Sequence, residues 1–106
     1  MVKIIWTDSA IQDLNDIGEY IAKDSQKYAE ITVEKLFTST GILEKNPKAG
    51  RIVPELENDR IRELIRGNYR VVYYINDEFT IEVLTVHNSA RLLGNSYNFS
   101  DLNEDL

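Results

Sequence analysis

The sequence predicts an α+β fold in which an N-terminal strand and a helical hairpin pack on an antiparallel sheet, in the order β-α-α-β-β-β. Two observations lead to this fold class. Between residues 8 and 45, apolar side chains recur every three or four positions, which is the period of an amphipathic helix. Between residues 60 and 93, the chain instead alternates in polarity or is rich in β-branched and aromatic residues, which favour strands.

The first strand and the first helix are predicted from composition and from a capping signal. Val2 to Trp6 is a short apolar run that indicates an opening strand. Thr7, Asp8 and Ser9 are all residue types favoured at a helix N-cap, so a helix is expected to begin there. Its apolar stripe consists of Ala10, Leu14, Ile17 and Ile21.

A second helix is predicted from about Tyr28 to Lys45, after a break at residues 24–27. Asn46 and Pro47 end this helix, because the residue before a proline disfavours the helical region. Residues 38–41 (Thr-Ser-Thr-Gly) are poor helix formers, and the glycine alone costs about 1 kcal/mol relative to alanine. We therefore expect distortion near the end of the helix, which forms an antiparallel hairpin with the first one.

A loop and a three-stranded meander are expected in the second half of the chain. Residues 47–58 are rich in turn formers and are predicted as a loop. The strands are predicted at residues 60–66, 69–75 and 79–86. Gly67 and Asn68 are expected to supply the positive φ angles of the first hairpin turn. The first strand alternates between two sets, which are Ile61, Glu63 and Ile65 against Arg62, Leu64 and Arg66. This period of two predicts a strand with one buried face.

Length and composition indicate a single domain that uses no metal or other cofactor. At 106 residues the chain can bury roughly two-thirds of its unfolded-chain surface. It has no cysteine and one histidine, which excludes disulfides and a multi-histidine metal centre. No apolar run approaches the roughly 20 residues that span a bilayer, and the N-terminus lacks a signal-peptide pattern. We expect a cytoplasmic protein with its domain at residues 1–94 and an acidic, weakly ordered tail at residues 95–106.

The charge balance argues against nucleic acid as a general partner. The formal net charge is −6, whereas proteins that bind a phosphate backbone carry a basic surface. The sequence therefore predicts no direct, sequence-specific DNA binding and no non-specific binding. A small local pocket of arginines is still compatible with this charge.

The lysines and arginines are segregated along the chain. All six lysines lie at or before Lys48, and all six arginines lie at or after Arg51. The arginine side chain is a planar, always charged fork that matches phosphate and carboxylate groups. The segregation indicates that the sheet is the working surface. In the alternative interpretation, three arginines form a solvated face opposite four glutamates, namely Arg60, Arg62 and Arg66 opposite Glu55, Glu57, Glu63 and Glu82.

Three residues of the last two strands and the segment after them suggest a catalytic site. His87 is the one side chain whose ordinary pKa lies near neutrality, and it is predicted at the end of the third strand, near Arg91. If Arg70 approaches from the neighbouring strand, the three could bind a phosphate and move a proton during RNA cleavage by an internal 2′-hydroxyl. In the alternative interpretation, His87 is an ordinary surface residue at a strand end.

Two motifs lie in the loop and in the predicted meander. The segment from Pro47 to Glu55 has the pattern P-x-x-G-R-x-V-P-E, and the segment from Gly67 to Tyr73 has the pattern G-x-Y-R-V-V-Y. They are accompanied by Trp6-Thr7, Ala10, Leu14, Ile17, Tyr20-Ile21, Ile61 to Leu64, Leu84 to His87 and Ala90 to Leu93. In this order and spacing the residues resemble the RelE/ParE superfamily of toxin–antitoxin toxins, over residues 1 to about 94. The compact helical hairpin on an antiparallel sheet that this resemblance implies agrees with the fold predicted above.

The resemblance implies one of two activities. ParE-like members are inhibitors of DNA gyrase that act by binding, whereas RelE-like members are metal-independent, ribosome-dependent mRNA endonucleases. Arg70 matches the arginine of the Y-R-x-x-Y strand in this superfamily, and Arg91 matches an arginine of the terminal segment. The basic cluster that follows the last strand in RelE-like enzymes is replaced here by residues 87–90 (His-Asn-Ser-Ala). This depletion and the net charge of −6 favour the ParE-like activity.

We therefore predict a ParE-like, growth-inhibiting toxin that binds DNA gyrase. Its other predicted partner is a cognate antitoxin with a basic, partly helical toxin-binding segment. The predicted target- or antitoxin-binding residues are Arg51, Arg62, Arg70, His87 and Arg91. One alternative is a RelE-like mRNA endonuclease, with ribosome and mRNA as partners and with Arg70, His87 and Arg91 in the catalytic site. The other is a degenerate toxin that only binds its antitoxin.

Overall fold

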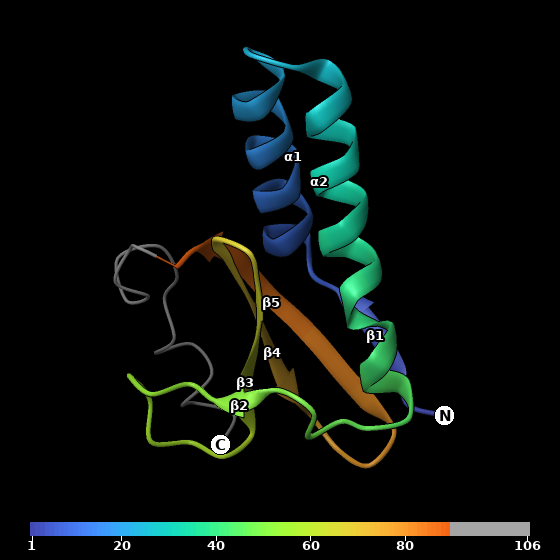
Figure 1. Cartoon of the computed structure of the whole chain (residues 1–106). Coiled ribbons are helices and arrows are strands. Elements are labelled where there is room, and N and C mark those ends of the chain that lie inside the picture. The colour runs from blue at the N-terminus through green and yellow to red at the C-terminus, as the bar shows by residue number, and fades with distance from the viewer. Residues whose placement is uncertain (90–106) are drawn as a thin grey trace.

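The computed structural model describes residues 1–89 and confirms the predicted α+β fold (Figure 1). A helical hairpin rises beyond one end of a sheet, so that the turn between its two helices lies far from the strands. Arg91, the expected domain boundary after residue 94 and the expected weak order of residues 95–106 lie outside the described residues.

The N-terminal elements begin as predicted. Strand β1 is Lys3–Trp6 and helix α1 is Asp8–Ala22. Thr7 is the N-cap residue, and its Oγ1 accepts a hydrogen bond from the Ala10 N–H at 3.2 Å. The same hydroxyl donates to the Val83 carbonyl at 2.8 Å, in strand β5 (Thr80–Asn88). The start of α1 is therefore attached to the sheet through its own cap.

The second helix differs in its bounds from the prediction. Helix α2 is Gln26–Thr38, capped by the Ser25 hydroxyl, and the 3₁₀ helix η1 follows at Ser39–Glu44. The prediction of one helix to Lys45 is therefore wrong, whereas the expected distortion near its end is confirmed. The hydroxyls of residues 38–40 donate to backbone carbonyls three or four residues earlier, which offers the backbone an alternative to regular helix bonds.

The sheet has five strands in the order β1-β5-β4-β3-β2. Strands β3 (Ile61–Arg66), β4 (Tyr69–Ile75) and β5 form the predicted antiparallel meander, and β5 continues two residues further than expected. The edge strand β1 pairs in parallel with β5. At the other edge, β2 (Arg51–Ile52) pairs with β3 inside the segment that was predicted as a loop.

The turn between β3 and β4 uses one positive φ angle and not two. Gly67 has a φ of 59°, and no non-glycine residue between residues 1 and 89 has a positive φ. The expected positive φ at Asn68 is therefore wrong. A glycine at the first central position followed by a residue with negative φ is the pattern of a type II′ turn, which also suits the twist of a hairpin.

The two faces of the sheet carry separate apolar cores. The face toward the helices packs against both of them and against η1, with the buried residues Ala10, Leu14, Leu36, Leu43, Leu64, Val71, Tyr73, Ile81, Val83 and Val86. The opposite face carries a smaller cluster closed by the segment after β2, with the buried residues Val53, Ile61, Val72, Tyr74 and Leu84. Both faces of the sheet are thus covered over much of its area.

Because both faces of the sheet are covered, the burial of the β3 side chains differs from the prediction. Glu63 and Leu64 are both buried, one on each face, whereas Ile65 is 43% exposed. The prediction of one buried face, shared by Ile61, Glu63 and Ile65, is therefore wrong at Ile65 and at Leu64. The alternation itself is present, but the covering elements reach only the first part of the strand.

Candidate functional site

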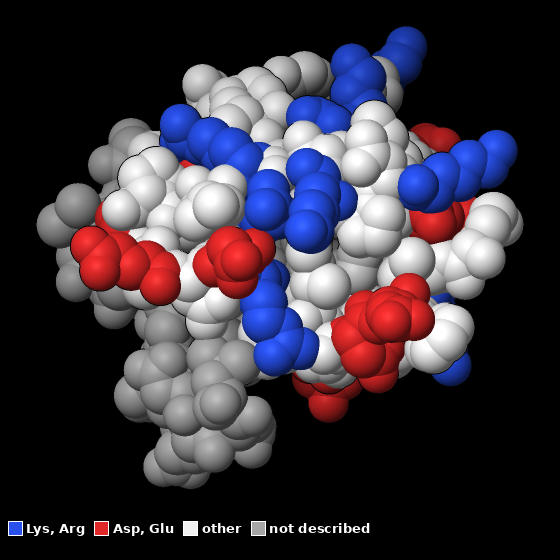
Figure 2. Space-filling view, turned by 90° about the horizontal axis from the view of Figure 1, so that it is seen from below, with Lys and Arg blue, Asp and Glu red and all other residues white. Residues whose placement is uncertain are grey.

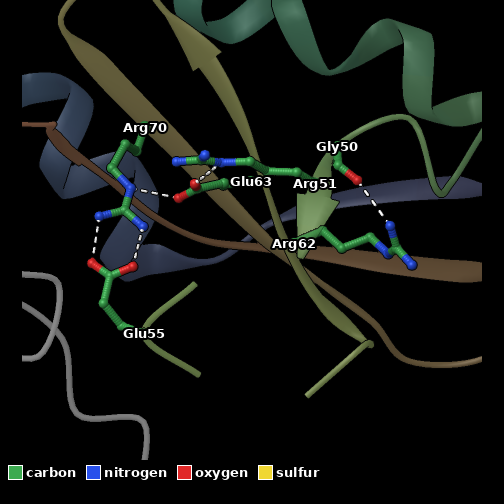
Figure 3. A network of polar contacts seen from close by, with 6 residues as sticks. All are labelled: Gly50, Arg51, Glu55, Arg62, Glu63 and Arg70. Atoms are coloured by element: carbon green, nitrogen blue, oxygen red, sulfur yellow. Dashed lines mark hydrogen bonds and ion pairs between the residues drawn. The ribbon is translucent and has the colours of Figure 1, made fainter. Parts of the chain in front are cut away.

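A network of charged side chains occupies the sheet face turned away from the helices (Figure 3). Arg70 of β4 donates from Nε to Oε1 of Glu63 at 2.5 Å. Its two terminal nitrogens donate to the two carboxylate oxygens of Glu55, both at 2.7 Å. All three nitrogens of the Arg70 guanidinium are therefore bound to carboxylates of the same chain.

Glu63 is shared between two arginines. Its second oxygen, Oε2, accepts a hydrogen bond from Nε of Arg51 at 2.6 Å. Arg51 lies on the edge strand β2 and is the direct partner of Glu63 in the β2–β3 pairing. The side chain of Glu63 is fully buried, whereas that of Arg51 is 60% exposed. The network thus runs from the interior to the edge of the sheet.

The balance of charge explains why a carboxylate can be buried here. Burying an ionised group is costly unless it is paired and hydrogen-bonded, and two arginines and two glutamates together have no net charge. The hydrogen bonds to Glu55 raise the pKa of Arg70 above its ordinary value, with a further contribution from Glu63, although burial acts in the opposite direction. Arg70 is therefore permanently charged in its buried position.

The structure places His87 beside Arg70. The two are direct partners in the antiparallel pairing of β4 and β5, so their side chains share a face of the sheet. His87 is only 6% exposed, and β5 continues one residue beyond it to Asn88. His87 therefore lies near the end of its strand as predicted, but the alternative interpretation as a surface residue is wrong. Arg91 lies outside the described residues, so the structure brings together two of the three suggested catalytic residues.

Arg62 points away from this network, toward the loop that precedes β2. Its Nη1 donates to the Gly50 carbonyl at 3.0 Å, and its Nε donates to the Asp59 carbonyl at 3.0 Å (Figure 3). These bonds hold the two ends of the segment that covers the second core. Arg62 is the pairing partner of Ile52, the residue next to Arg51, but it does not bind the Glu63 carboxylate that Arg51 binds.

Gly50 and Tyr73 fix the backbone that carries Arg51. The Gly50 N–H donates to the Tyr73 hydroxyl at 2.9 Å, and this hydroxyl donates to the Pro47 carbonyl at 2.7 Å. Burial raises the pKa of Tyr73, which keeps its phenol protonated. A Cβ atom at residue 50 would lie 2.5 Å from the Glu63 carbonyl oxygen, so only glycine allows this close approach.

A groove of about 700 Å³ lies between the two helices. Apolar or small residues that line it include Leu14, Gly18, Ala29 and Val33. A Cβ atom at Gly18 would approach the Val33 side chain to 3.1 Å, so the small residue permits close packing of α1 on α2. Its charged lining residues are all acidic, namely Glu19, Glu30 and Glu34. The groove thus combines apolar side chains with a negative charge.

The sequence did not identify the carboxylates that bind Arg70. In the alternative interpretation, Glu55 and Glu63 stand opposite a solvated face of arginines, and this is wrong for Glu63, whose side chain is fully buried. One signal was present, because Glu63 occupies an apolar position in the alternation between Ile61 and Ile65. A charged residue in such a position requires a partner of opposite charge on an adjacent strand.

Two further properties concern residues 1–89. No group of three or more histidine, aspartate or glutamate side chains lies close enough there to hold a metal ion. Within the same residues, no helix is both long and apolar enough to cross a bilayer.

The comparisons with known proteins agree with this architecture. The profile of a family described as the ParE toxin of the type II toxin–antitoxin system parDE matches residues 4–93. The chain belongs to the ParE toxin family. A relative from Caulobacter vibrioides, Toxin RelE2, is 30% identical over 93 residues, which are 87% of this chain and the full length of the relative. The chain is therefore a toxin of the RelE/ParE superfamily of type II toxin–antitoxin systems.

Two solved structures have the same fold as this ParE family member. One is a chain of the chromosomal ParDE system of P. aeruginosa, with a TM-score of 0.67 and 21% identity over 83% of this chain and 96% of that one. The other comes from the toxin–antitoxin complex RelBE2 of Mycobacterium tuberculosis, with a TM-score of 0.54 and 26% identity over 82% of this chain and 96% of that one.

Proposed function

We propose that this ParE family toxin inhibits DNA gyrase by binding it, and that a cognate antitoxin neutralises it. The observation that carries the choice of a binder over a nuclease is the state of Arg70. Cleavage of RNA through a 2′-hydroxyl needs a cationic group on the phosphate, yet Nε, Nη1 and Nη2 of Arg70 are all bound to Glu55 and Glu63. In this proposal, Arg70 of the Y-R-x-x-Y strand stabilises the fold and does not bind a phosphate.

The burial of His87 supports the same choice. A general acid or base must come within hydrogen-bond reach of the proton that it transfers. His87 and Arg70 are 6% and 5% exposed, so neither presents its polar atoms to a large substrate such as ribosome-bound mRNA. A binding function needs no such access, because it depends on the outer surface of the toxin.

The antitoxin is proposed to bind with a basic, partly helical segment. The two solved structures come from toxin–antitoxin systems, ParDE and RelBE2. In this chain, the net charge of −6 attracts a cationic segment, and the groove between α1 and α2 combines an apolar lining with three glutamates. An amphipathic helix with apolar residues on one side and lysines or arginines on the other fits this groove.

Two assays on purified toxin test the proposed target. The wild-type toxin should inhibit supercoiling of relaxed plasmid by gyrase, and addition of antitoxin in equal amount should restore it. The same toxin should leave mRNA intact when it is added to translating ribosomes. Undiminished supercoiling at a large excess of toxin, together with growth inhibition in cells, would exclude gyrase as the target.

Reversal of two charges at the groove tests the antitoxin site. In the double variant Glu30→Lys/Glu34→Lys, the affinity for the antitoxin should fall by about tenfold or more, because two attractive charges become repulsive. The matched control is Glu57→Lys/Asp59→Lys, which reverses two exposed carboxylates in the segment between β2 and β3 and should bind as the wild type does. Equal losses in the two variants would point to net charge alone.

The similarity to Toxin RelE2 of Caulobacter vibrioides supports a second candidate function, that of a RelE-like, ribosome-dependent mRNA endonuclease. In that case His87 is the proton-transfer group, since it is the one histidine of the chain. His87→Gln should then lower the rate of mRNA cleavage by about 10²–10⁴-fold while leaving ribosome binding nearly unchanged. Under the gyrase proposal, the same variant retains its inhibition of supercoiling, and wild-type toxin cuts no mRNA.

A further inference from the structure

Arg51 and Arg70 are placed almost equivalently around the carboxylate of Glu63. Arg51 donates from Nε to one oxygen at 2.6 Å, and Arg70 donates from Nε to the other at 2.5 Å. In both side chains the hydrogen bond to Glu63 comes from Nε, and none is donated to it by Nη1 or Nη2, which form the outer edge of the guanidinium. Figure 3 shows both guanidinium groups beside the carboxylate of Glu63, and Glu55 bound to Arg70.

The two outer edges differ in what they bind. The edge of Arg70 holds the carboxylate of Glu55 through two bonds of 2.7 Å. Among residues 1–89, no group accepts a hydrogen bond from Nη1 or Nη2 of Arg51. The side chain of Arg51 is 60% exposed, so this second edge is open to a partner. It is also preoriented, because the bond to the fully buried Glu63 restricts the rotation of the side chain.

We infer that Arg51 is a recognition residue for a carboxylate on the protein that the toxin targets, bound through Nη1 and Nη2 as Glu55 is bound by Arg70. A carboxylate fits a guanidinium edge through two parallel hydrogen bonds, and the structure contains this geometry once already. Holding the fork in place before binding lowers the entropy that the complex must lose. This inference rests on the proposed function, in which the target is a protein.

The charge of the protein favours an acidic protein group over a nucleic acid as the ligand of Arg51. Figure 2, which views the molecule from below the orientation of Figure 1, shows lysines and arginines gathered at the middle of that face with acidic residues beside them. A phosphate backbone presents many negative charges in a row and is repelled by the net charge of −6. A single aspartate or glutamate needs only one open fork.

The site is also distinct from the acidic groove between α1 and α2. Arg51 belongs to the edge strand β2, and no residue of β2 lines that groove. A basic antitoxin segment is attracted to the groove and repelled by an arginine fork. The two surfaces therefore have opposite charge preferences, and variants of Arg51 should separate target binding from antitoxin binding.

The test uses Arg51→Lys and Arg51→Ala in the full-length chain, with Arg66→Ala as the matched control. Lysine keeps the positive charge and a contact to Glu63 but has no second edge for a carboxylate. Arg66 is an exposed arginine of β3 whose Nη1 donates to the carbonyl of its neighbour Ile65. For each variant, urea unfolding first establishes the folded fraction, and growth inhibition, gyrase inhibition and antitoxin affinity are then measured.

Arg51→Ala should lower growth inhibition and target inhibition by about tenfold or more, the effect of losing hydrogen bonds to a charged group. Arg51→Lys should show most of this loss, Arg66→Ala should match the wild type, and antitoxin affinity should stay within about twofold in all three. Full toxicity of folded Arg51→Ala would overturn the inference. So would a parallel loss of antitoxin affinity, or Arg51-dependent binding of a single-stranded RNA probe.

The proposed target and the role of Arg51 can fail separately. If wild-type toxin does not inhibit gyrase, but the Arg51 variants lose growth inhibition and keep antitoxin affinity, gyrase is the wrong target and the inference stands. If wild-type toxin inhibits gyrase and Arg51→Ala inhibits it equally well, the proposed function stands and the inference is wrong.

Discussion

The two faces of the sheet are both closed, but with different chemistry. The face toward the helices is covered by apolar side chains, among them Leu43 of η1, which is fully buried. The opposite face has a smaller apolar cluster bordered by the buried pair of Arg70 and Glu63. Burial of apolar area is non-directional, whereas a buried ion pair fixes the orientation of its members. The first face holds the fold together, and the second also positions Arg51.

The largest effect is expected from removing Arg70. Arg70→Ala leaves the fully buried Glu63 with Arg51 as its one cation, and breaking a buried pair costs about 3–5 kcal/mol of unfolding free energy. Leu43→Ala, on the helix-covered face, should cost about 3 kcal/mol through loss of buried volume. Urea unfolding of both variants gives the two losses of unfolding free energy.

The double variant Arg70→Met/Glu63→Met sharpens this result, because it removes both charges of the pair. Its unfolding free energy should be closer to that of the wild type than that of Arg70→Ala is, since no buried carboxylate is left with too few partners. A cost below about 1 kcal/mol for Arg70→Ala would mean that the charged face contributes little to stability.

An intermediate effect is expected at Tyr73, whose ring belongs to the helix-facing core and whose hydroxyl reaches the loop before β2. Tyr73→Phe removes two hydrogen bonds and should lower the unfolding free energy by about 1–3 kcal/mol, because the Gly50 N–H and the Pro47 carbonyl lose their partner. Thermal and urea unfolding at neutral pH give this value. An unchanged midpoint would show that water replaces both bonds.

The same residue gives a pH dependence with a defined sign. The pKa of Tyr73 is raised in the folded state above the ordinary value of 10.0, so its contribution to stability is complete below that pH. As the pH rises above 10.0, the unfolded chain releases the phenolic proton more readily than the folded chain, and stability falls. Between about pH 9 and pH 11, Tyr73→Phe should lose less stability than the wild type.

The smallest effect is expected where the cover of the second face ends. Ile65 is 43% exposed and Ile61 is 2% exposed, although they lie on the same strand in the same alternation. Ile65→Thr should change the unfolding free energy by no more than about 0.5 kcal/mol, whereas Ile61→Thr should cost about 1 kcal/mol or more. Similar losses at the two positions would indicate that the cover extends further along β3.

The sequence predicts the helix-covered face well and the charged face poorly, for a physical reason. Periodicity and caps are local signals, so Thr7, the apolar stripe of the first helix and the turn at Gly67 could be located from neighbouring residues alone. The bond of Arg70 to Glu55 joins residues 15 positions apart, on a strand and a loop. Such pairing depends on how the segment after β2 folds back, which no local pattern specifies.

Local sequence patterns also did not predict which arginines are exposed. Arg51 and Arg70 each belong to one of the two motifs found in the sequence. Arg51 nevertheless lies exposed at the sheet edge, whereas Arg70 lies in the interior. The sequence named both as binding residues, and that assignment stays a prediction. Only the two-residue strand β2, which was expected to be a loop, puts Arg51 opposite Glu63 and leaves its outer edge exposed.

The parallel pairing of β1 with β5 has a consequence for biosynthesis. The hydroxyl of Thr7 is bound to Val83, 76 positions later, and β5 lies between β1 and β4 in the sheet. Closing so long a loop is slow compared with forming the local hairpin of α1 and α2. A nascent chain therefore has no complete sheet until β5 has left the ribosome, and a protein shortened before residue 80 lacks the β5 residues of both apolar clusters. We therefore expect the toxin to complete its fold only when its last strand, β5, is available.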